Sequence, residues 1–197
     1  MPANVEKTLA WPIQLATRTS VNPREPVRAG GEPLVVEKAR NGDRTAFARL
    51  YEQYNRMVHA ILLSRVPRCE VDDLVQDVFV LALRRLSTLR DSAAFGGWLA
   101  MIARNRATDY LRTAPAVSPI QEGQLRMAAA SPESMAALDA ILALPDCYRE
   151  TLLMRLVEGM TGPEIAERTG LTQDSVRVNL HRGMKLLRER INGEARP

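Results

Sequence analysis

The sequence has only two cysteines and two histidines in 197 residues, and neither type forms a cluster. Cys69 and Cys147 belong to no CxxC pair and have no Cys or His at metal-ligand spacing, which predicts two free thiols and no metal site. His59 and His181 have no carboxylate or cysteine close in sequence that would suggest a catalytic cluster. We therefore expect a protein that is not an enzyme and that needs no cofactor.

Long hydrophobic runs are also missing. The apolar patch LAWPIQLA (residues 9–16) is interrupted by Pro12 and is too short for a signal h-region or a membrane span. No stretch alternates apolar and polar residues with a period of two, as a half-buried strand would. The sequence thus predicts helices, a cytoplasmic location and no membrane contact of its own.

Lysine is scarce, because 24 of the 27 basic residues are arginines. The formal net charge of +4 is compatible with a nucleic-acid partner. Arginine suits bidentate contacts to phosphate, but the arginine codons of a GC-rich genome explain most of these residues equally well. Only arginines that lie on a motif therefore count toward a binding site.

Prolines and glycines divide the chain into segments. Residues 1–33 carry five prolines and no sustained apolar period, which predicts a flexible N-terminal leader. Residues 114–133, APAVSPIQEGQLRMAAASPE, have the composition of a linker. Over residues 34–113, and again over 134–193, apolar residues recur at steps of three and four. We expect an all-α fold of two small helical domains joined by a flexible linker.

The stretch TGPEIAERTGLTQDSVRVNLHR, residues 161–182, has the pattern of two helices around a tight turn. Pro163 suits a first helical turn, with Thr161 or Gly162 before it as the cap. Gly170 ends this helix, since glycine takes the left-handed conformation at little cost. Thr172 caps the second helix. Its inward face follows steps of four, three and four: Val176, Leu180, Gly183 and Leu187.

The other faces of this second helix carry side chains that suit contacts with bases and phosphates. They are Gln173, Arg177, Val178, His181, Arg182 and Lys185. A capped helix with such a face, following a glycine turn, predicts a DNA-binding helix-turn-helix. The alternative is an ordinary amphipathic hairpin with a solvated basic face.

Residues 71–86, VDDLVQDVFVLALRRL, predict a helix with an apolar face and an acidic one. The apolar face holds Leu74, Val78, Leu81 and Ala82, and the other holds Asp73, Gln76 and Asp77. Asp72, Asp73 and Asp77 resemble metal ligands or a general acid/base pair, but no histidine or glycine-bearing loop accompanies them. A surface for a basic protein partner is the functional interpretation, and a solvated face is the alternative.

Residues 89–112, LRDSAAFGGWLAMIARNRATDYLR, place Phe95 and Trp98 between a polar loop and a helix with arginine and asparagine. An aromatic ring beside amides and cations is what an unstacked base needs. Taken singly, Trp98 is better explained as a core residue. Both roles stay open for it.

Three segments together resemble a known family: DLVQDVFVLALRRL, FGGWLAMIARNRATDYLR and LDAILALPDCYRETLLMRLVEGMTGPEIAERTGLTQDSVRVNLHRGMKLLRERI. In this order they resemble the two conserved regions of the extracytoplasmic-function (ECF) branch of bacterial RNA polymerase sigma factors. The resemblance covers roughly residues 34–191. It implies sigma region 2 over 34–113 and sigma region 4 over 134–193, with core RNA polymerase and promoter DNA as partners.

The resemblance also assigns roles to single residues. Binding to core polymerase falls on Asp73, Leu74, Gln76, Asp77 and Phe79. Recognition and melting of the minus-10 element, with capture of a flipped base, falls on Arg90, Asp91, Ser92, Phe95, Trp98, Asn105 and Asp109. Recognition of the minus-35 element falls on Thr172, Gln173, Arg177, Val178, His181, Arg182 and Lys185.

The family pattern further implies an anti-sigma factor that restrains the protein, and a monomer when it is free. The chain departs from the pattern in carrying Ala100 and Met101 after the Trp-Leu pair, and in lacking a glycine within LRDSAAF. In the recognition helix it has Val178, Asn179, Gly183 and Met184. The alternatives are an enzyme and a stand-alone regulator that would dimerise on a palindromic site without polymerase.

Overall fold

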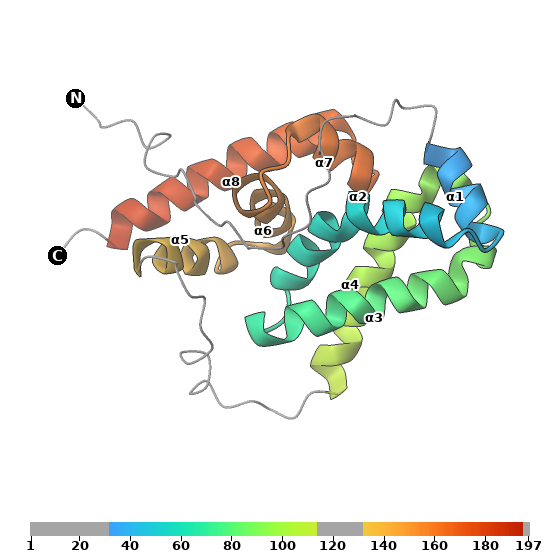
Figure 1. The fold of residues 1–197 in the computed structure, drawn as a ribbon. Helices are drawn as coiled ribbons and strands as arrows, with labels where there is room; N and C mark the ends of the chain where they lie inside the picture. The colour runs from blue at the N-terminus through green and yellow to red at the C-terminus, as the bar shows by residue number, and fades with distance from the viewer. Residues whose placement is uncertain (1–31, 114–131, 195–197) are drawn as a thin grey trace.

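The computed structural model describes residues 32–113 and 132–194, and the regular secondary structure in these two ranges is helical (Figure 1). This confirms the predicted all-α fold class. The first range, called the first half below, contains α1 (Glu32–Arg40), α2 (Arg44–Leu63), η2 (Arg68–Glu70), α3 (Val71–Arg85), η3 (Leu86–Thr88), η4 (Ser92–Ala94) and α4 (Phe95–Thr113).

The second range, called the second half, contains α5 (Pro132–Leu142), α6 (Asp146–Leu152), the π-helical turn η6 (Leu153–Val157), α7 (Gly162–Thr169) and α8 (Gln173–Glu194). Each half begins two residues before the predicted boundary, at Glu32 and at Pro132. The remainder of the predicted leader and of the predicted linker lies outside the described residues. None of the described helices is long and apolar enough to cross a bilayer.

The first half is built around α2. The carboxylate of Asp43 caps this helix by accepting from the backbone N–H groups of Thr45 at 2.8 Å and Ala46 at 3.1 Å. Leu50 and Ile61 are fully buried, because α1, α3 and α4 all pack on α2. The buried face of α2 therefore forms the centre of the first half.

The second half has the helix cap and the glycine turn that the sequence predicted. Thr161 is the N-cap of α7, and Glu164 hydrogen-bonds back to the Thr161 backbone N–H at 2.7 Å, which completes a capping box. The Thr161 N–H is also the main reason that the pKa of Glu164 is lowered. Gly170 ends α7 in the left-handed conformation, with φ of 73°. The long helix α8 then packs across α5, α6 and α7.

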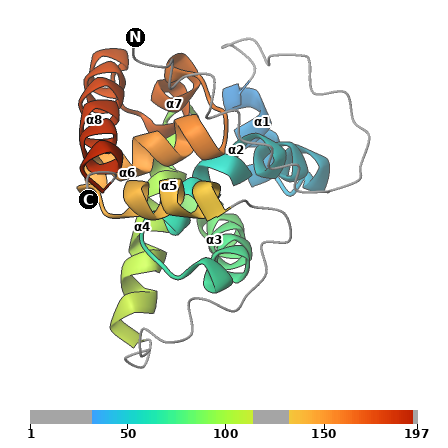
Figure 2. The ribbon, with the colours of Figure 1, turned by 90° about the vertical axis from the view of Figure 1, so that its left-hand side faces the viewer.

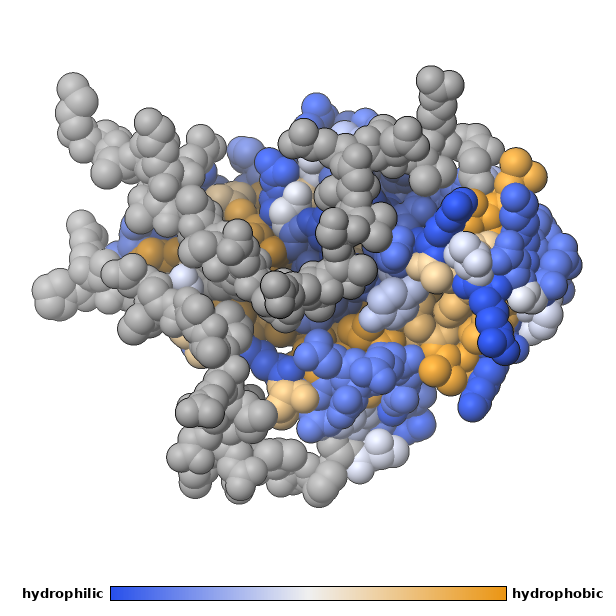
Figure 3. Space-filling model, viewed as in Figure 1, coloured by the Kyte–Doolittle hydropathy of each residue, from blue (hydrophilic) through white to orange (hydrophobic). Residues whose placement is uncertain are grey.

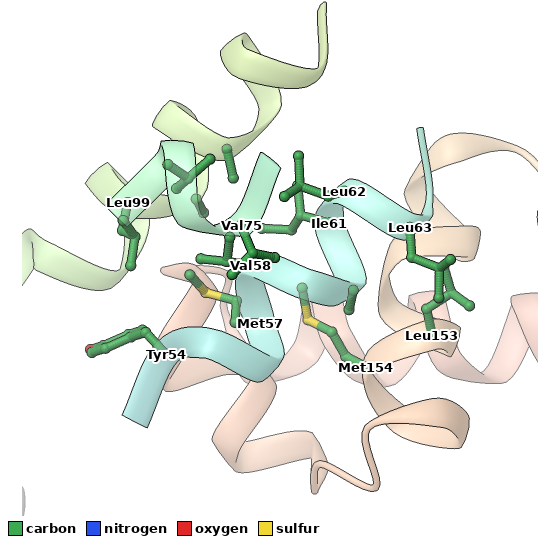
Figure 4. Packing of buried hydrophobic residues seen from close by; sticks show 14 of the residues in the cluster. Tyr54, Met57, Val58, Ile61, Leu62, Leu63, Val75, Leu99, Leu153 and Met154 are labelled. Atoms are coloured by element: carbon green, nitrogen blue, oxygen red, sulfur yellow. The ribbon is translucent and has the colours of Figure 1, made fainter. Parts of the chain in front are cut away.

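The two halves pack directly on each other, which the sequence did not predict. η6 and α7 of the second half contact α2, and α7 also contacts α4 (Figure 2). A single apolar cluster runs through both halves. Figure 4 shows Leu63 of α2 beside Leu153 of η6, with Met57 and Met154 in the same cluster. The core therefore continues from one half into the other.

Candidate nucleic-acid and protein interfaces

The packing of α8 decides which of its faces is exposed. Val176 and Leu187 are buried, as the predicted inward stripe requires. Gly183 lies where α8 crosses α6, and a Cβ there would be 3.0 Å from a Leu152 methyl carbon and 3.1 Å from the Cβ of Tyr148. A larger residue would require the Leu152 and Tyr148 side chains to shift. The departure from the family pattern at Gly183 thus has a packing reason.

The outward face of α8 carries the predicted minus-35 side chains. Gln173, Arg177, Val178, His181, Arg182 and Lys185 are all exposed, and Thr172 is exposed just before the helix. The Thr172 hydroxyl accepts from the Ser175 N–H at 3.1 Å, so it caps α8 as predicted. Arg177 is paired with Asp174 at 3.1 Å, but both side chains are more than three-quarters exposed. Such an exposed pair contributes little to stability, so the Arg177 guanidinium can exchange the Asp174 carboxylate for a phosphate.

Two of the five predicted polymerase-binding residues are buried. Asp73, Gln76 and Asp77 are exposed on α3, whereas Leu74 and Phe79 are only 2% and 3% exposed. In this arrangement Leu74 and Phe79 point into the apolar core and are not part of the exposed surface of α3. Asp77 is paired with Arg106 of α4 at 2.7 Å.

The burial of Phe79 has a clear local cause. Its ring lies 4.6 Å from the ring of Tyr51 and 6.4 Å from that of Phe47, both on α2. These aromatic contacts hold α3 on α2.

The exposed face of α3 also includes two apolar residues that the sequence did not single out. Val80 is 48% exposed and Leu83 is 51% exposed. Figure 3 shows apolar side chains at the surface over α2 and α3. Helical periodicity could have identified both residues. Val80 follows Asp73, and Leu83 follows Gln76, by seven residues, which is about two helical turns and places each pair on the same face.

The predicted minus-10 residues fall into an exposed group and a buried one. Arg90, Asp91, Asn105 and Asp109 are exposed. Ser92 is 8% exposed and its hydroxyl donates to Glu37, while Phe95 is fully buried. Trp98 is partly buried.

Two ring contacts explain the positions of these aromatic residues. The Phe95 ring packs 5.1 Å from the ring of Tyr54 and 5.8 Å from that of Trp98. Phe95 is therefore a core residue in this arrangement. Trp98 packs on it and is only partly buried.

Tyr54 anchors α1 to this aromatic group. Its hydroxyl donates to Glu32, and Gln53 donates to the same carboxylate at 3.1 Å. Burial, together with the hydrogen bond and charge of Glu32, raises the pKa of Tyr54 far above its ordinary value. The hydroxyl therefore stays protonated and remains a donor.

No cluster of three His, Cys, Asp or Glu residues in the described ranges could hold a metal ion. Cys69 and Cys147 are both free and exposed.

The chain is similar to sigma factors over most of its length. The family model for Sigma-70 region 2 matches residues 50–115, and the model for Sigma-70 region 4 matches residues 134–187. The ECF RNA polymerase sigma factor BldN of Streptomyces coelicolor is 29% identical over 175 residues, which cover 82% of this chain and just under two thirds, 66%, of that relative. The ECF RNA polymerase sigma-E factor of Escherichia coli K12 is 28% identical over 185 residues, covering 84% and 95%.

A solved structure shows a similar fold. It is described as CnrH in complex with the cytosolic domain of CnrY, and it matches with a TM-score of 0.58 and 24% identity, over 83% of this chain and 98% of that chain.

Proposed function

The chain belongs to the extracytoplasmic-function branch of the sigma-70 family, and we propose that it directs core RNA polymerase to promoters through three surfaces of its described residues. The outward face of α8 recognises the minus-35 element. The exposed face of α3 binds core polymerase, and the segment from Arg90 to Asp109 recognises and melts the minus-10 element.

The observation that carries this proposal is the division of α8 into two faces. Its inward face is buried against α6 and α7, so the helix is held rigidly, while Arg177, His181 and Arg182 project from the other side. The capped N-terminal end of α8 can enter a major groove, where arginine contacts guanine through two hydrogen bonds.

The polymerase surface in this proposal differs from the set expected from the sequence. It consists of Asp73, Gln76 and Asp77 together with the exposed apolar residues Val80 and Leu83, and it excludes the buried Leu74 and Phe79. Apolar residues beside carboxylates form the kind of surface that a partly apolar, basic protein partner would cover.

We further propose that the protein acts in the cytoplasm, without catalytic activity of its own, and that an anti-sigma factor restrains it. The family resemblance supports these points. CnrH, which has a similar fold, is described in complex with the cytosolic domain of CnrY.

Run-off transcription tests the proposed function directly. The purified protein and core RNA polymerase are incubated with promoter fragments from the source genome, and core polymerase alone is the control. Specific transcripts that require the protein would support the proposal. Binding to duplex DNA without polymerase, combined with no transcripts, would instead favour a stand-alone regulator.

Substitutions in α8 test the minus-35 surface. Arg177→Ala and Arg182→Ala should each cost about 1–3 kcal/mol of promoter binding by the holoenzyme if the arginine contacts a guanine. Arg188→Ala is the matched control, because it removes the same charge from an exposed site nearer the C-terminal end of α8. Transcription that is unchanged in both variants would exclude this surface.

Substitutions in α3 test the polymerase surface. A variant with both Asp73→Ala and Asp77→Ala should bind core polymerase more weakly, because it loses both exposed carboxylates of this face. Glu167→Ala is the control, because it removes an exposed carboxylate from α7, away from α3. Co-purification of the double variant with core at wild-type affinity would rule the surface out.

A further inference from the structure

Charged side chains form several contacts between the two halves, and their signs are segregated. In the ion pairs that cross, the first half supplies the cationic side chain and the second half supplies the carboxylate. The pairs are Arg56–Glu158 at 3.7 Å, His59–Glu158 at 2.7 Å, Arg65–Asp146 at 3.2 Å, Arg65–Glu150 at 3.5 Å, Arg68–Asp139 at 2.7 Å and Arg104–Glu150 at 2.5 Å. This segregation makes the two surfaces electrostatically complementary.

Glu150 lies at the centre of these contacts. It is on α6 and is only 7% exposed, and it accepts two hydrogen bonds from the Arg104 guanidinium, at 2.5 and 3.2 Å. A nitrogen of the Arg65 guanidinium lies 3.5 Å from the same carboxylate. Leaving a buried carboxylate without a partner is costly, and both of these arginines belong to the first half. The position of Glu150 therefore suits a second half that is docked.

Backbone contacts bring the helix-turn-helix onto the start of α4. A Cβ at Gly96 would lie 2.4 Å from the carbonyl oxygen of Arg168, which is near the end of α7. A Cβ at the turn residue Gly170 would lie 3.6 Å from the Cα of Gly97. The Arg168 guanidinium also donates to the carbonyl oxygen of Gln53 in α2. Gly96 thus permits a contact that any larger residue would obstruct.

This contact conflicts with the simultaneous use of both promoter surfaces. The two promoter elements are named for positions about 25 base pairs apart, which is about 85 Å at 3.4 Å per base pair. Here the turn that precedes α8 touches the start of α4, beside Trp98. The two surfaces that recognise these elements therefore lie too close together to reach both of them.

We propose that this arrangement is a closed state of the free protein, in which ion pairs centred on Glu150 hold the helix-turn-helix on α4, and which must open before both promoter elements are bound. The need for opening rests on the proposed function. The closed state itself rests only on the contacts between the halves.

The distance between the halves can be measured in the full-length chain by pulsed electron spin resonance. The exposed residues Cys69 and Cys147 are replaced by serine, and spin labels are attached at Ser87→Cys and Arg188→Cys, two exposed positions in different halves. The free protein should give one narrow distance distribution. Addition of core polymerase and promoter DNA should shift it to longer distances.

Glu150→Gln tests the ionic contacts, because it removes the charge and preserves the shape of the side chain. It should raise the ratio of open to closed protein by about tenfold. This is the lower end of the range expected for the loss of a charge-assisted hydrogen bond. Glu189→Gln is the matched control, since Glu189 pairs at 3.9 Å with Lys185 of its own helix. This control should leave the distribution unchanged.

Salt provides a second measurement that needs no substitution in the contact. Raising NaCl from 0.1 to 1 M shortens the Debye length from about 10 to about 3 Å and should increase the open population of the labelled protein. A free protein with broad, long distances would overturn the closed state. An unchanged distribution in both Glu150→Gln and 1 M NaCl would overturn the role of the ion pairs.

Transcription by the labelled protein separates the two proposals. Specific transcripts from a protein that is open when free would refute the closed state and leave the proposed function intact. A narrow, short distance without any transcripts would refute the proposed function and the need for opening, while the contact between the halves would stand.

Discussion

Two adjacent glycines at the start of α4 should respond to alanine with opposite signs. Alanine is favoured over glycine within a helix by up to about 1 kcal/mol, and less in the first turn, so both substitutions gain a fraction of that amount. At Gly97 the new Cβ would meet the carbonyl oxygen of Thr169 at 3.6 Å and the Cα of Gly170 at 4.0 Å, which are ordinary contacts. Gly97→Ala should therefore stabilise the protein slightly.

At Gly96 the same substitution creates an overlap. The Cβ would lie 2.4 Å from the Arg168 carbonyl oxygen and 3.0 Å from a ring carbon of Tyr54, and the first of these is a backbone atom that cannot rotate away. Overpacking of this kind costs about 1–3 kcal/mol, which exceeds the gain in helix propensity. The part of this cost that comes from Arg168 cannot exceed the free energy of separating the halves, because separation relieves that overlap.

Urea denaturation followed by far-UV circular dichroism measures both effects. We expect a lower free energy of unfolding for Gly96→Ala than for the wild type, and an equal or higher one for Gly97→Ala. If Gly96→Ala opens the molecule, its m-value should also fall, since the open form buries less surface before unfolding. Equal free energies of unfolding for the two variants would show that α7 does not rest on α4 in solution.

Two further predictions concern a cap and a titrating pair. Thr161→Ala removes one partner of the capping box of α7 and should lower the free energy of unfolding by about 1 kcal/mol, measured by the same denaturation. Burial lowers the pKa of His59, but the hydrogen bond and charge of Glu158 and the charge of Asp72 outweigh it, so the pKa is raised above 6.5. A raised pKa means that the His59–Glu158 pair stabilises the contact below pH 6.5 and that this contribution is lost as pH rises through the raised value. Arg56, 3.7 Å from Glu158, stays charged throughout, so the loss should be partial. The open population of the spin-labelled protein should increase from pH 6 to pH 9, and His59→Gln should remove most of this increase; an unchanged slope in that variant would contradict the assignment.

Local signals were enough to predict much of the second half. Thr161, Gly170 and Thr172 each act within a few residues of themselves, through a side-chain cap or a left-handed backbone. The inward stripe of α8 follows from helical periodicity, which is also a local property. These features therefore agreed between sequence and structure.

Other features depended on parts of the chain that are far apart. The stretch from Val78 to Leu83 is apolar throughout, so composition alone could not tell the buried Phe79 from the exposed Val80. The rings of Phe47 and Tyr51 on α2 cover Phe79, and no pattern within α3 shows them. Arg104 and Glu150 are 46 residues apart, and no local pattern links them. For the same reason, the packing of the two halves could not be predicted from the sequence.

The segregation of charge across the contact has a consequence for competition with nucleic acid. Arg65, Arg68 and Arg104 are held by carboxylates of the same chain, which act as built-in counterions. When the halves separate, these guanidinium groups lose their carboxylates and become able to bind other anions, including the phosphates of DNA. Intramolecular carboxylates and a polyanion thus compete for the same arginines, and the free protein attracts DNA least when it is closed.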